Sequence, residues 1–344
     1  MVRIGVIGLG HWGPNLVRVF TTLPDSRVTG LSDMNTDRLR QISRQAPDAL
    51  AAPRADDILD PQTIDAAVIA TPTRTHYALA KQALRRGIHT FVEKPLAASV
   101  QECEELIELA DKQGVLLFVG HVFLYTPAVA KLKELILRGD LGRVSYISCT
   151  RLNLGPIRRD VNALWDLAPH DISIILELMG RFPVGVNCQG LAYLDERIHD
   201  VCFLTLRFTE KSMALVHVSW LDPNKRRLIT VVGDKKMAIY DDIEPLEKVK
   251  VYDKGVEAPP ESDIFADFHF SFRYGDTYSP RLNEVEPLKA ECQHFIDCIQ
   301  EGKRPKTDGA QGLEVVRVLE AAHSSLLDGG GRVGLVSALP AAVR

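Results

Sequence analysis

The sequence has few cysteines and no long apolar run, and each absence narrows the class of protein. The cysteines form no C-x-x-C pair, which argues against a zinc site or a disulfide framework, and most lie in apolar patterns typical of buried thiols in a reducing compartment. No apolar run approaches the roughly 20 residues that span a bilayer, and no charged leader with an apolar core precedes the first strand-like segment. These features predict a cytoplasmic protein with no membrane partner and no metal site.

The sequence also lacks a strong excess of charge. Its 344 residues carry a formal net charge of -4, with 46% hydrophobic and 25% charged residues, as in ordinary soluble proteins. Such a balance gives no reason to expect nucleic acid or an anionic membrane as a partner. The length predicts two domains with a large core.

Three glycines near the N-terminus form a G-x-G-x-x-G motif. Gly8, Gly10 and Gly13 follow a β-branched run over residues 2–7 and precede a helix-like pattern that begins near Asn15. A strand, a glycine turn and a helix in this order predict a dinucleotide-binding fold. Gly8 permits the tight turn, Gly10 lets a pyrophosphate approach, and Gly13 allows close packing of helix and strand, while the helix N-terminus attracts phosphate.

A carboxylate follows at the position that selects the cofactor. Residues 27–32 read as a second strand that ends at Asp33, where a carboxylate binds the adenosine ribose hydroxyls of NAD. Asp33 would repel a 2′-phosphate, and no arginine follows until Arg38, so NAD is favoured over NADP. The alternative is that Asp33 caps the next helix, a task that Asn35 or Thr36 would perform as well.

The order of the predicted elements changes near residue 120. Up to that point strands and helices alternate, which is typical of a doubly wound parallel sheet. From residue 143 strand-like stretches follow one another with few helices between them, which predicts a mostly antiparallel sheet. Helices at 287–299 and 312–327 close the chain, and residues 255–286 read as a loop. We therefore expect an α/β protein with a Rossmann domain over residues 1–121 and an α+β domain for substrate binding and oligomerisation over residues 122–344.

The first candidate for chemistry is Glu93-Lys94-Pro95, which follows a strand at 88–92. Open α/β sheets bind ligands at the carboxyl ends of their strands, so Lys94 is expected beside the nicotinamide. Near a positively charged cofactor, a lysine pKa can fall far enough for proton exchange near neutral pH. The alternative is a surface lysine before a rigid proline.

The second candidate is the segment from Trp165 to Ser173. Pro169 suits the first turn of a helix, so we expect Asp166 and His170 at the mouth of that helix. An imidazole can accept a hydroxyl proton while hydride leaves the same carbon, and a carboxylate can orient the ring. In the alternative interpretation, Asp166 caps the helix and His170 is a surface residue.

These motifs, in this order and spacing, resemble the glucose–fructose oxidoreductase / inositol dehydrogenase / rhizopine-catabolism oxidoreductase family over nearly the whole chain. The resemblance implies that Lys94, Asp166 and His170 are catalytic, and that an open sheet face packs subunits into a homodimer or homotetramer. The chain departs from the family pattern at Ala168, where glycine is common, and at Pro169. The predicted cofactor residues are Gly8, Gly10, His11, Trp12, Gly13, Asp33, Thr71, Pro72, His76, Glu93 and Lys94.

The segments 163–173 and 217–223 resemble a subgroup of amino-sugar and surface-polysaccharide enzymes that oxidise C3 of a UDP-N-acetylhexosamine. Arginine forks suit phosphate oxygens, and Arg158, Arg159, Arg273 and Arg281 lie near the motif or in the long loop. Solvated surface arginines are the alternative at each position. The predicted substrate residues are Arg158, Asn162, Trp165 and Tyr274.

The sequence therefore predicts an NAD-dependent dehydrogenase of a sugar hydroxyl, with C3 of UDP-N-acetylglucosamine or a close relative as the substrate. A dehydrogenase of a free polyol, inositol or unactivated sugar is the first alternative. A non-catalytic NAD-binding sensor is the second, and an intact Lys94, Asp166 and His170 set argues against it.

Overall fold

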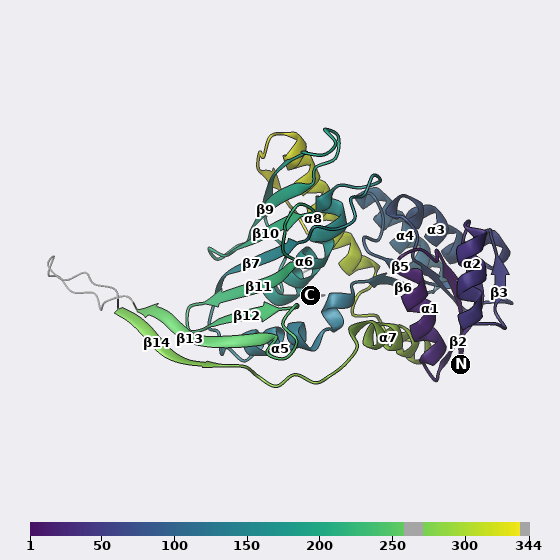
Figure 1. Ribbon diagram of the computed structural model, residues 1–344, viewed down its shortest axis with the longest axis horizontal. Helices are drawn as coiled ribbons and strands as arrows, with labels where there is room; N and C mark the ends of the chain where they lie inside the picture. The colour runs from purple at the N-terminus through teal and green to yellow at the C-terminus, as the bar shows by residue number, and fades with distance from the viewer. Residues whose placement is uncertain (258–270, 338–344) are drawn as a thin grey trace, which may run out of the picture. The chain divides into compact units, whose positions relative to one another are not determined.

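The computed structural model describes residues 1–257 and 271–337, and the first of its two sheets is parallel throughout (Figure 1). Its strand order is β3-β2-β1-β4-β5-β6. The chain crosses over between β3 and β4, so the strand order reverses beside β1, as in dinucleotide-binding sheets. The central strands are apolar and buried on both faces, as parallel strands covered by helices are. The strands are β1 (Val2–Ile7), β2 (Ser26–Ser32), β3 (Leu50–Ala52), β4 (Ala66–Ile69), β5 (His89–Glu93) and β6 (Leu117–Gly120).

Four helices connect these strands: α1 (Gly13–Thr22), α2 (Thr36–Ile42), α3 (His76–Arg85) and α4 (Val100–Gln113). The predicted capping pair at the start of α4 is present. The Ser99 hydroxyl accepts a hydrogen bond from the Glu102 N–H at 3.2 Å, and the Glu102 carboxylate accepts one from the Ala98 N–H at 3.0 Å. These bonds satisfy N–H groups that have no partner within the helix.

The second sheet is mostly antiparallel, with the order β14-β13-β12-β11-β7-β10-β9-β8-β15. The pair β7 and β10 is parallel, and the remaining pairs are antiparallel. Helix α6 (Ala163–Met179) packs on β7, β9 and β10, and α5 (Pro127–Leu137) packs on β12. The strands are β7 (Val144–Leu152), β8 (Gly185–Leu191), β9 (Val201–Arg207), β10 (Met213–Ser219), β11 (Arg226–Gly233), β12 (Met237–Asp241), β13 (Val249–Glu257), β14 (Ser271–Tyr278) and β15 (Val333–Gly334). The predicted α/β fold class is confirmed.

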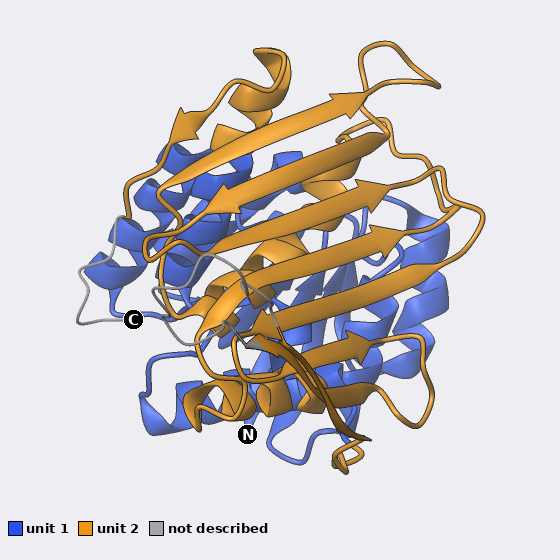
Figure 2. Cartoon of the chain, turned by 90° about the vertical axis from the view of Figure 1, so that its left-hand side faces the viewer, with its two compact units in different colours: residues 1–125, 285–320 blue, residues 126–284, 321–344 orange. Residues whose placement is uncertain are grey.

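The chain forms two compact units, and the first includes a distant segment (Figure 2). It contains residues 1–125 together with 285–320, and the second contains 126–284 and 321–344. The sequence placed residues 285–320 in the second domain. They pack with the first unit because Phe295 of α7 (Pro287–Glu301) lies 5.6 Å from Phe91 and 5.2 Å from Phe118, measured between ring centroids. Helix α8 (Gly309–Leu327) contributes residues to both units.

Two local predictions are wrong. Pro169 lies inside α6 rather than in its first turn, because Asn162 caps the helix and α6 begins at Ala163. The expected loop at 255–286 contains the end of β13 and all of β14, which pair along a two-stranded arm (Figure 1). Its residues 258–270 lie outside the described part. The exposure of nearly every β14 side chain explains why its sequence lacks the apolar pattern of a covered strand.

All six cysteines are buried free thiols, as the sequence indicated. Within residues 1–257 and 271–337, no helix is both long enough and apolar enough to cross a lipid bilayer.

Candidate functional site

The glycine turn after β1 leaves room only where a phosphate is expected. Gly8 has a φ of +93°, and an ideal Cβ on it would lie 2.7 Å from the Ala70 carbonyl group. A Cβ on Gly13 would lie 2.0 Å from the Gly8 carbonyl oxygen, so a side chain at either position would force the turn apart. A Cβ on Gly10 would approach only the Arg38 guanidinium, at 3.7 Å. The turn therefore keeps an open approach to its backbone at Gly10.

Asp33 connects the end of β2 to this turn. Its carboxylate accepts hydrogen bonds from the Leu9 N–H at 2.6 Å and the Asn35 N–H at 2.7 Å. Asn35, and not Asp33, caps α2 through bonds from the Asp37 and Arg38 N–H groups, both at 3.1 Å. The backbone thus holds a half-buried carboxylate beside the glycine turn, where ribose hydroxyls would bind.

His76 joins the turns that follow β4 and β5. Its Nδ1 lies 2.8 Å from the Pro95 carbonyl oxygen, and its Nε2 lies 2.8 Å from that of Thr71. This buried ring therefore has a clear structural role, in addition to its predicted place near the cofactor. Of the other predicted cofactor residues, His11 and Pro72 are exposed, whereas Trp12 is half-buried at the start of α1.

Lys94 lies beside a buried acidic pair. Phe91 and Glu93 are two residues apart on β5 and so face the same side of the sheet, while Glu291 lies one helical turn before Phe295 on α7. Phe295 packs on Phe91. The adjacent positions on the same faces of the two elements, Glu93 on β5 and Glu291 on α7, therefore lie close to each other. Burial raises the pKa of Glu93 to about 7 against the lowering effect of the Lys94 charge, and burial followed by the Glu93 charge raises the pKa of Glu291 well above its usual range.

His121, which follows β6, is a further buried group near Lys94. The residue is 1% exposed, and burial, followed by the Lys94 charge, lowers the pKa of its imidazole to about 3. The β5–β6 pairing places Gly120 opposite Glu93, and a Cβ on Gly120 would lie 3.1 Å from the Glu93 carboxyl group. The carboxyl edge of the sheet therefore combines a lysine, an acidic pair and a neutral imidazole in a small volume. Together with the glycine turn and Asp33, this edge offers groups that suit a bound dinucleotide.

In the second unit, helix α6 carries Asp166 and His170. The Asn162 side chain caps α6 by accepting a bond from the Trp165 N–H at 3.1 Å, so Asp166 lies in the first turn and His170 one turn further on. Residues four apart share one face of a helix, which places both side chains on the same side of α6. Pro169 has no N–H to donate to the preceding turn, and α6 nevertheless continues through it.

The Asp166 carboxylate has a separate donor at each oxygen. Arg158 Nη1 donates to Oδ1 at 3.0 Å, and the Trp220 indole N–H donates to Oδ2 at 3.1 Å. Arg158 also pairs with Asp160, at 3.0 Å and 2.6 Å. The first predicted substrate arginine is therefore bound to two carboxylates of its own unit.

The other predicted substrate residues are more scattered within this unit. Asn162 is buried as the cap of α6, and Trp165 lies edge-on to His323 at 6.5 Å between ring centroids. Tyr274 lies on β14 and is 78% exposed. Its neighbour Arg273 donates to Asp253 at 2.9 Å and to the Lys235 carbonyl oxygen.

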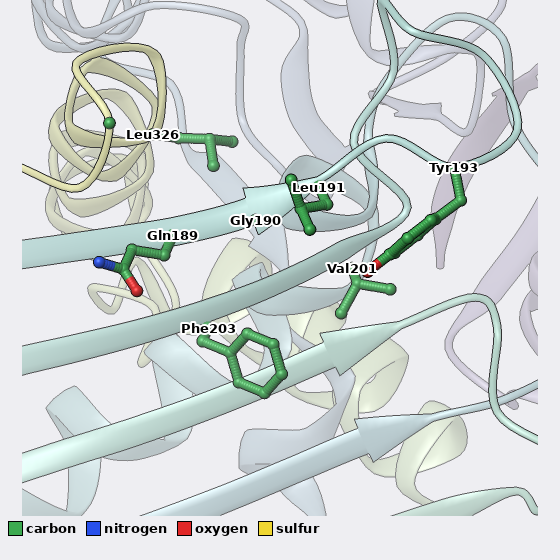
Figure 3. A pocket seen from close by; sticks show the side chains of 8 residues that line it. Gln189, Gly190, Leu191, Tyr193, Val201, Phe203 and Leu326 are labelled. Atoms are coloured by element: carbon green, nitrogen blue, oxygen red, sulfur yellow. The ribbon is translucent and has the colours of Figure 1, made fainter.

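A pocket of about 360 Å³ lies elsewhere in the second unit, at β8, β9 and the end of α8 (Figure 3). None of the predicted site residues lines it. Its lining is formed by Gln189, Gly190, Leu191, Tyr193, Val201, Phe203, Leu326 and Gly329.

Two family models match this chain in its two halves. The oxidoreductase family model with an NAD-binding Rossmann fold matches residues 2–121, and the GFO/IDH/MocA C-terminal domain model matches residues 129–239. The chain belongs to the GFO/IDH/MocA oxidoreductase family. Membership confirms the resemblance inferred from the motifs, and it makes the chain an oxidoreductase with NAD as its cofactor.

Relatives in the GFO/IDH/MocA family match along almost the whole chain. A UDP-N-acetylglucosamine 3-dehydrogenase of Acidithiobacillus ferrooxidans is 26% identical over 316 residues, which cover 92% of this chain and 94% of the relative. A myo-inositol 2-dehydrogenase of Thermotoga maritima is 26% identical over 341 residues, covering 94% and 96%. The solved structure of the Acidithiobacillus ferrooxidans UDP-N-acetylglucosamine 3-dehydrogenase GnnA has a TM-score of 0.80 at 23% identity, covering 95% of this chain and 98% of that one.

Sequence reasoning missed four buried polar groups near the predicted residues of this GFO/IDH/MocA chain: Arg151, His121, Trp220 and Glu291. A signal existed for Arg151, which interrupts an apolar strand pattern, and for Glu291, which falls on the apolar face of α7. No local signal distinguishes Trp220 or His121, because their partners come from distant parts of the chain.

Proposed function

We propose that this chain oxidises a hydroxyl group of a sugar or polyol, with C3 of a UDP-N-acetylhexosamine as the preferred position. The proposal rests above all on Asp166 and His170, which share one face of α6 in a chain whose first unit binds NAD. A carboxylate and an imidazole one helical turn apart suit the removal of a proton from an alcohol.

When bound, NAD supplies the hydride acceptor for this reaction. The residues of the chain supply placement and proton transfer. His170 accepts the hydroxyl proton in its neutral form, and Asp166 orients the ring and stabilises the charge that the ring acquires. Lys94, next to the buried Glu93, donates a hydrogen bond to the reacting oxygen and assists the proton transfer.

The UDP sugar is supported by the 3-dehydrogenase of Acidithiobacillus ferrooxidans, which matches 92% of this chain. One observation favours a free polyol or inositol as a second candidate. Arg158 and Arg273, the residues expected to bind a pyrophosphate, each pair with a carboxylate of their own unit. The similarly related myo-inositol 2-dehydrogenase supports this candidate equally.

A substrate panel separates the candidates. Purified protein is mixed with NAD and either UDP-N-acetylglucosamine, free N-acetylglucosamine or myo-inositol, and NADH is followed by its absorbance. Because sugar oxidation by NAD is uphill, a carbonyl trap such as hydrazine is added to every assay to remove the keto product and draw the equilibrium forward. Of the three substrates, we expect only UDP-N-acetylglucosamine to give NADH. Turnover with the free polyol alone would assign the second candidate, and NAD binding without turnover of any sugar would favour a sensor.

We also propose that a second copy of the chain covers the open face of the large sheet. Tyr146, Phe203 and Leu215 are 38%, 52% and 38% exposed, and the Phe203 ring stacks on His217 with centroids 4.2 Å apart. Apolar side chains on one exposed sheet face are typical of subunit interfaces. Light scattering should give a dimer or tetramer that Phe203→Glu weakens, whereas a monomer at all concentrations would contradict this arrangement.

A further inference from the structure

We propose that Arg158 and Trp220 are positioning residues that hold the Asp166 carboxylate from both sides, and that Arg158 does not bind the substrate. This inference rests on the proposed function, because it assigns a task to the residues around Asp166. It replaces the substrate-binding role that the sequence suggested for Arg158.

The two donors come from different parts of the second unit. Trp220 directly follows β10, and its backbone N–H donates to the Asp200 carbonyl oxygen at 3.0 Å. The residue is 2% exposed, and its indole N–H donates to Asp166 Oδ2. Because Trp220 is anchored in the sheet and buried, it holds one carboxylate oxygen in a fixed place.

Arg158 binds the other oxygen from the loop before α6. Nη1 donates to Asp166, while Nε and Nη2 donate to Asp160, so one guanidinium joins two carboxylates. The Arg158 side chain is 32% exposed and that of Asp166 is 18% exposed. A guanidinium that already faces two carboxylates offers little net positive charge to a pyrophosphate, whereas it is well placed to fix a carboxylate.

The consequence concerns the orientation of His170. A carboxylate held at both oxygens cannot rotate about its terminal bond, so the group that orients the imidazole keeps one direction. Loss of either donor would let the carboxylate turn, and misplacement of a catalytic group by about 1 Å can cost roughly 100-fold in rate. The expected effect is on kcat for every substrate, with little change in KM.

Four variants test the assignment. Arg158→Ala removes the guanidinium, and Arg158→Lys replaces it by a point charge. Trp220→Phe removes the indole N–H while keeping an aromatic ring. Arg197→Ala is the matched control, because the Arg197 Nε and Nη2 groups form a two-point pair with Asp195, as those of Arg158 do with Asp160, and the Arg197 side chain is 86% exposed. The kinetic constants are measured with the UDP sugar and with any free sugar that turns over.

We expect Arg158→Ala and Trp220→Phe to lower kcat about 10- to 100-fold with KM nearly unchanged. Arg158→Lys should recover part of the loss, and Arg197→Ala should resemble the parent protein. A raised KM for the UDP sugar alone in Arg158→Ala, with kcat intact, would overturn the proposal and return Arg158 to substrate binding. Equal effects of Arg158→Ala and Arg197→Ala would also overturn it.

A second measurement tests whether Arg158 and Trp220 hold the Asp166 carboxylate, even if the proposed function fails. The chain has three tryptophans, so its 15N-labelled indole N–H groups give three resolvable NMR signals. Trp220→Phe identifies the Trp220 signal. That signal should move in Arg158→Ala, since Asp166 loses its second donor, and stay in place in Arg197→Ala. An unmoved signal in Arg158→Ala would refute the proposal that Arg158 and Trp220 hold Asp166 together. A parent protein that turns over no sugar would refute the proposed function alone.

Discussion

Arg151 and Asp171 form a two-point ion pair in the interior of the second unit. Arg151 Nε donates to Asp171 Oδ2 at 2.8 Å, and Nη2 donates to Oδ1 at 2.9 Å. Their side chains are 7% and 2% exposed. The pair joins β7 to α6, the helix that carries Asp166 and His170, and so fixes the rotation of that helix on the sheet.

Breaking this pair should be costly. Asp171→Asn leaves the Arg151 charge buried without its counter-ion, which typically destabilises a protein by about 3–5 kcal/mol. Urea unfolding followed by circular dichroism measures the loss. Arg143→Ala is the control, because the Arg143 side chain is 70% exposed beside Asp234, and exposed pairs contribute about 0–1 kcal/mol. Equal losses in the two variants would show that the buried pair does not stabilise the unit.

Asp33 should determine the choice between NAD and NADP. Asp33→Ser removes the charge that would repel a 2′-phosphate, and the Arg38 guanidinium already lies near Gly10. We expect NADPH to bind more tightly and NADH more weakly, as measured by titration of cofactor fluorescence. Asp37→Ser, which changes an exposed acid in the first turn of α2, serves as the control. An unchanged NADPH affinity in Asp33→Ser would contradict the role given to this carboxylate.

His121 should make the folded state sensitive to acid. Its pKa is about 3 in the folded protein against 6.5 in an exposed imidazole, so between these values the unfolded chain binds the proton and the folded chain does not. Stability from this group therefore rises with pH across that window, by about 1.4 kcal/mol for each unit of pKa difference.

The pH dependence of denaturant midpoints for His121→Phe tests this expectation. The loss of stability below about pH 6 should be smaller in the variant than in the parent protein. His11→Phe, which changes an exposed ring, serves as the control. The test compares the slope of the parent with that of the variant, because Glu93 affects both. With a pKa near 7, Glu93 contributes a slope of stability against pH of opposite sign between about pH 4.5 and 7. Identical slopes for the parent and His121→Phe would contradict the assignment.

The elements of the first unit could be predicted because their signals are local. Gly8, Gly13 and the apolar strands follow from backbone sterics and burial, and Ser99 and Glu102 lie three residues apart at a helix start. Pro169 was misplaced for the same reason, since a proline is typical of a first turn, and only the cap at Asn162 shows that α6 begins earlier. The start of α6 is set by the Asn162 cap, which lies seven residues before Pro169.

Most of the polar arrangement around the candidate site could not be predicted. The Glu93–Glu291 pair and the bonds of Asp166 to Arg158 and Trp220 join residues that are brought together only by folding. The sequence predicted Arg158 as a phosphate ligand, because the two N–H groups of a guanidinium bind a phosphate and a carboxylate in the same way. Its actual partners, Asp160 and Asp166, become apparent only from the structure.

In the proposed NAD-dependent oxidation His170 takes the substrate proton, and a comparison of two proteins tests this role. Parent protein and His170→Ala are each assayed for NADH formation with the sugar that the parent oxidises, and their NAD affinity is measured in parallel. We predict that turnover falls by about 100-fold or more while NAD binding stays close to that of the parent, since general-base catalysis typically contributes 100- to 10,000-fold. Unchanged turnover in His170→Ala would contradict the account.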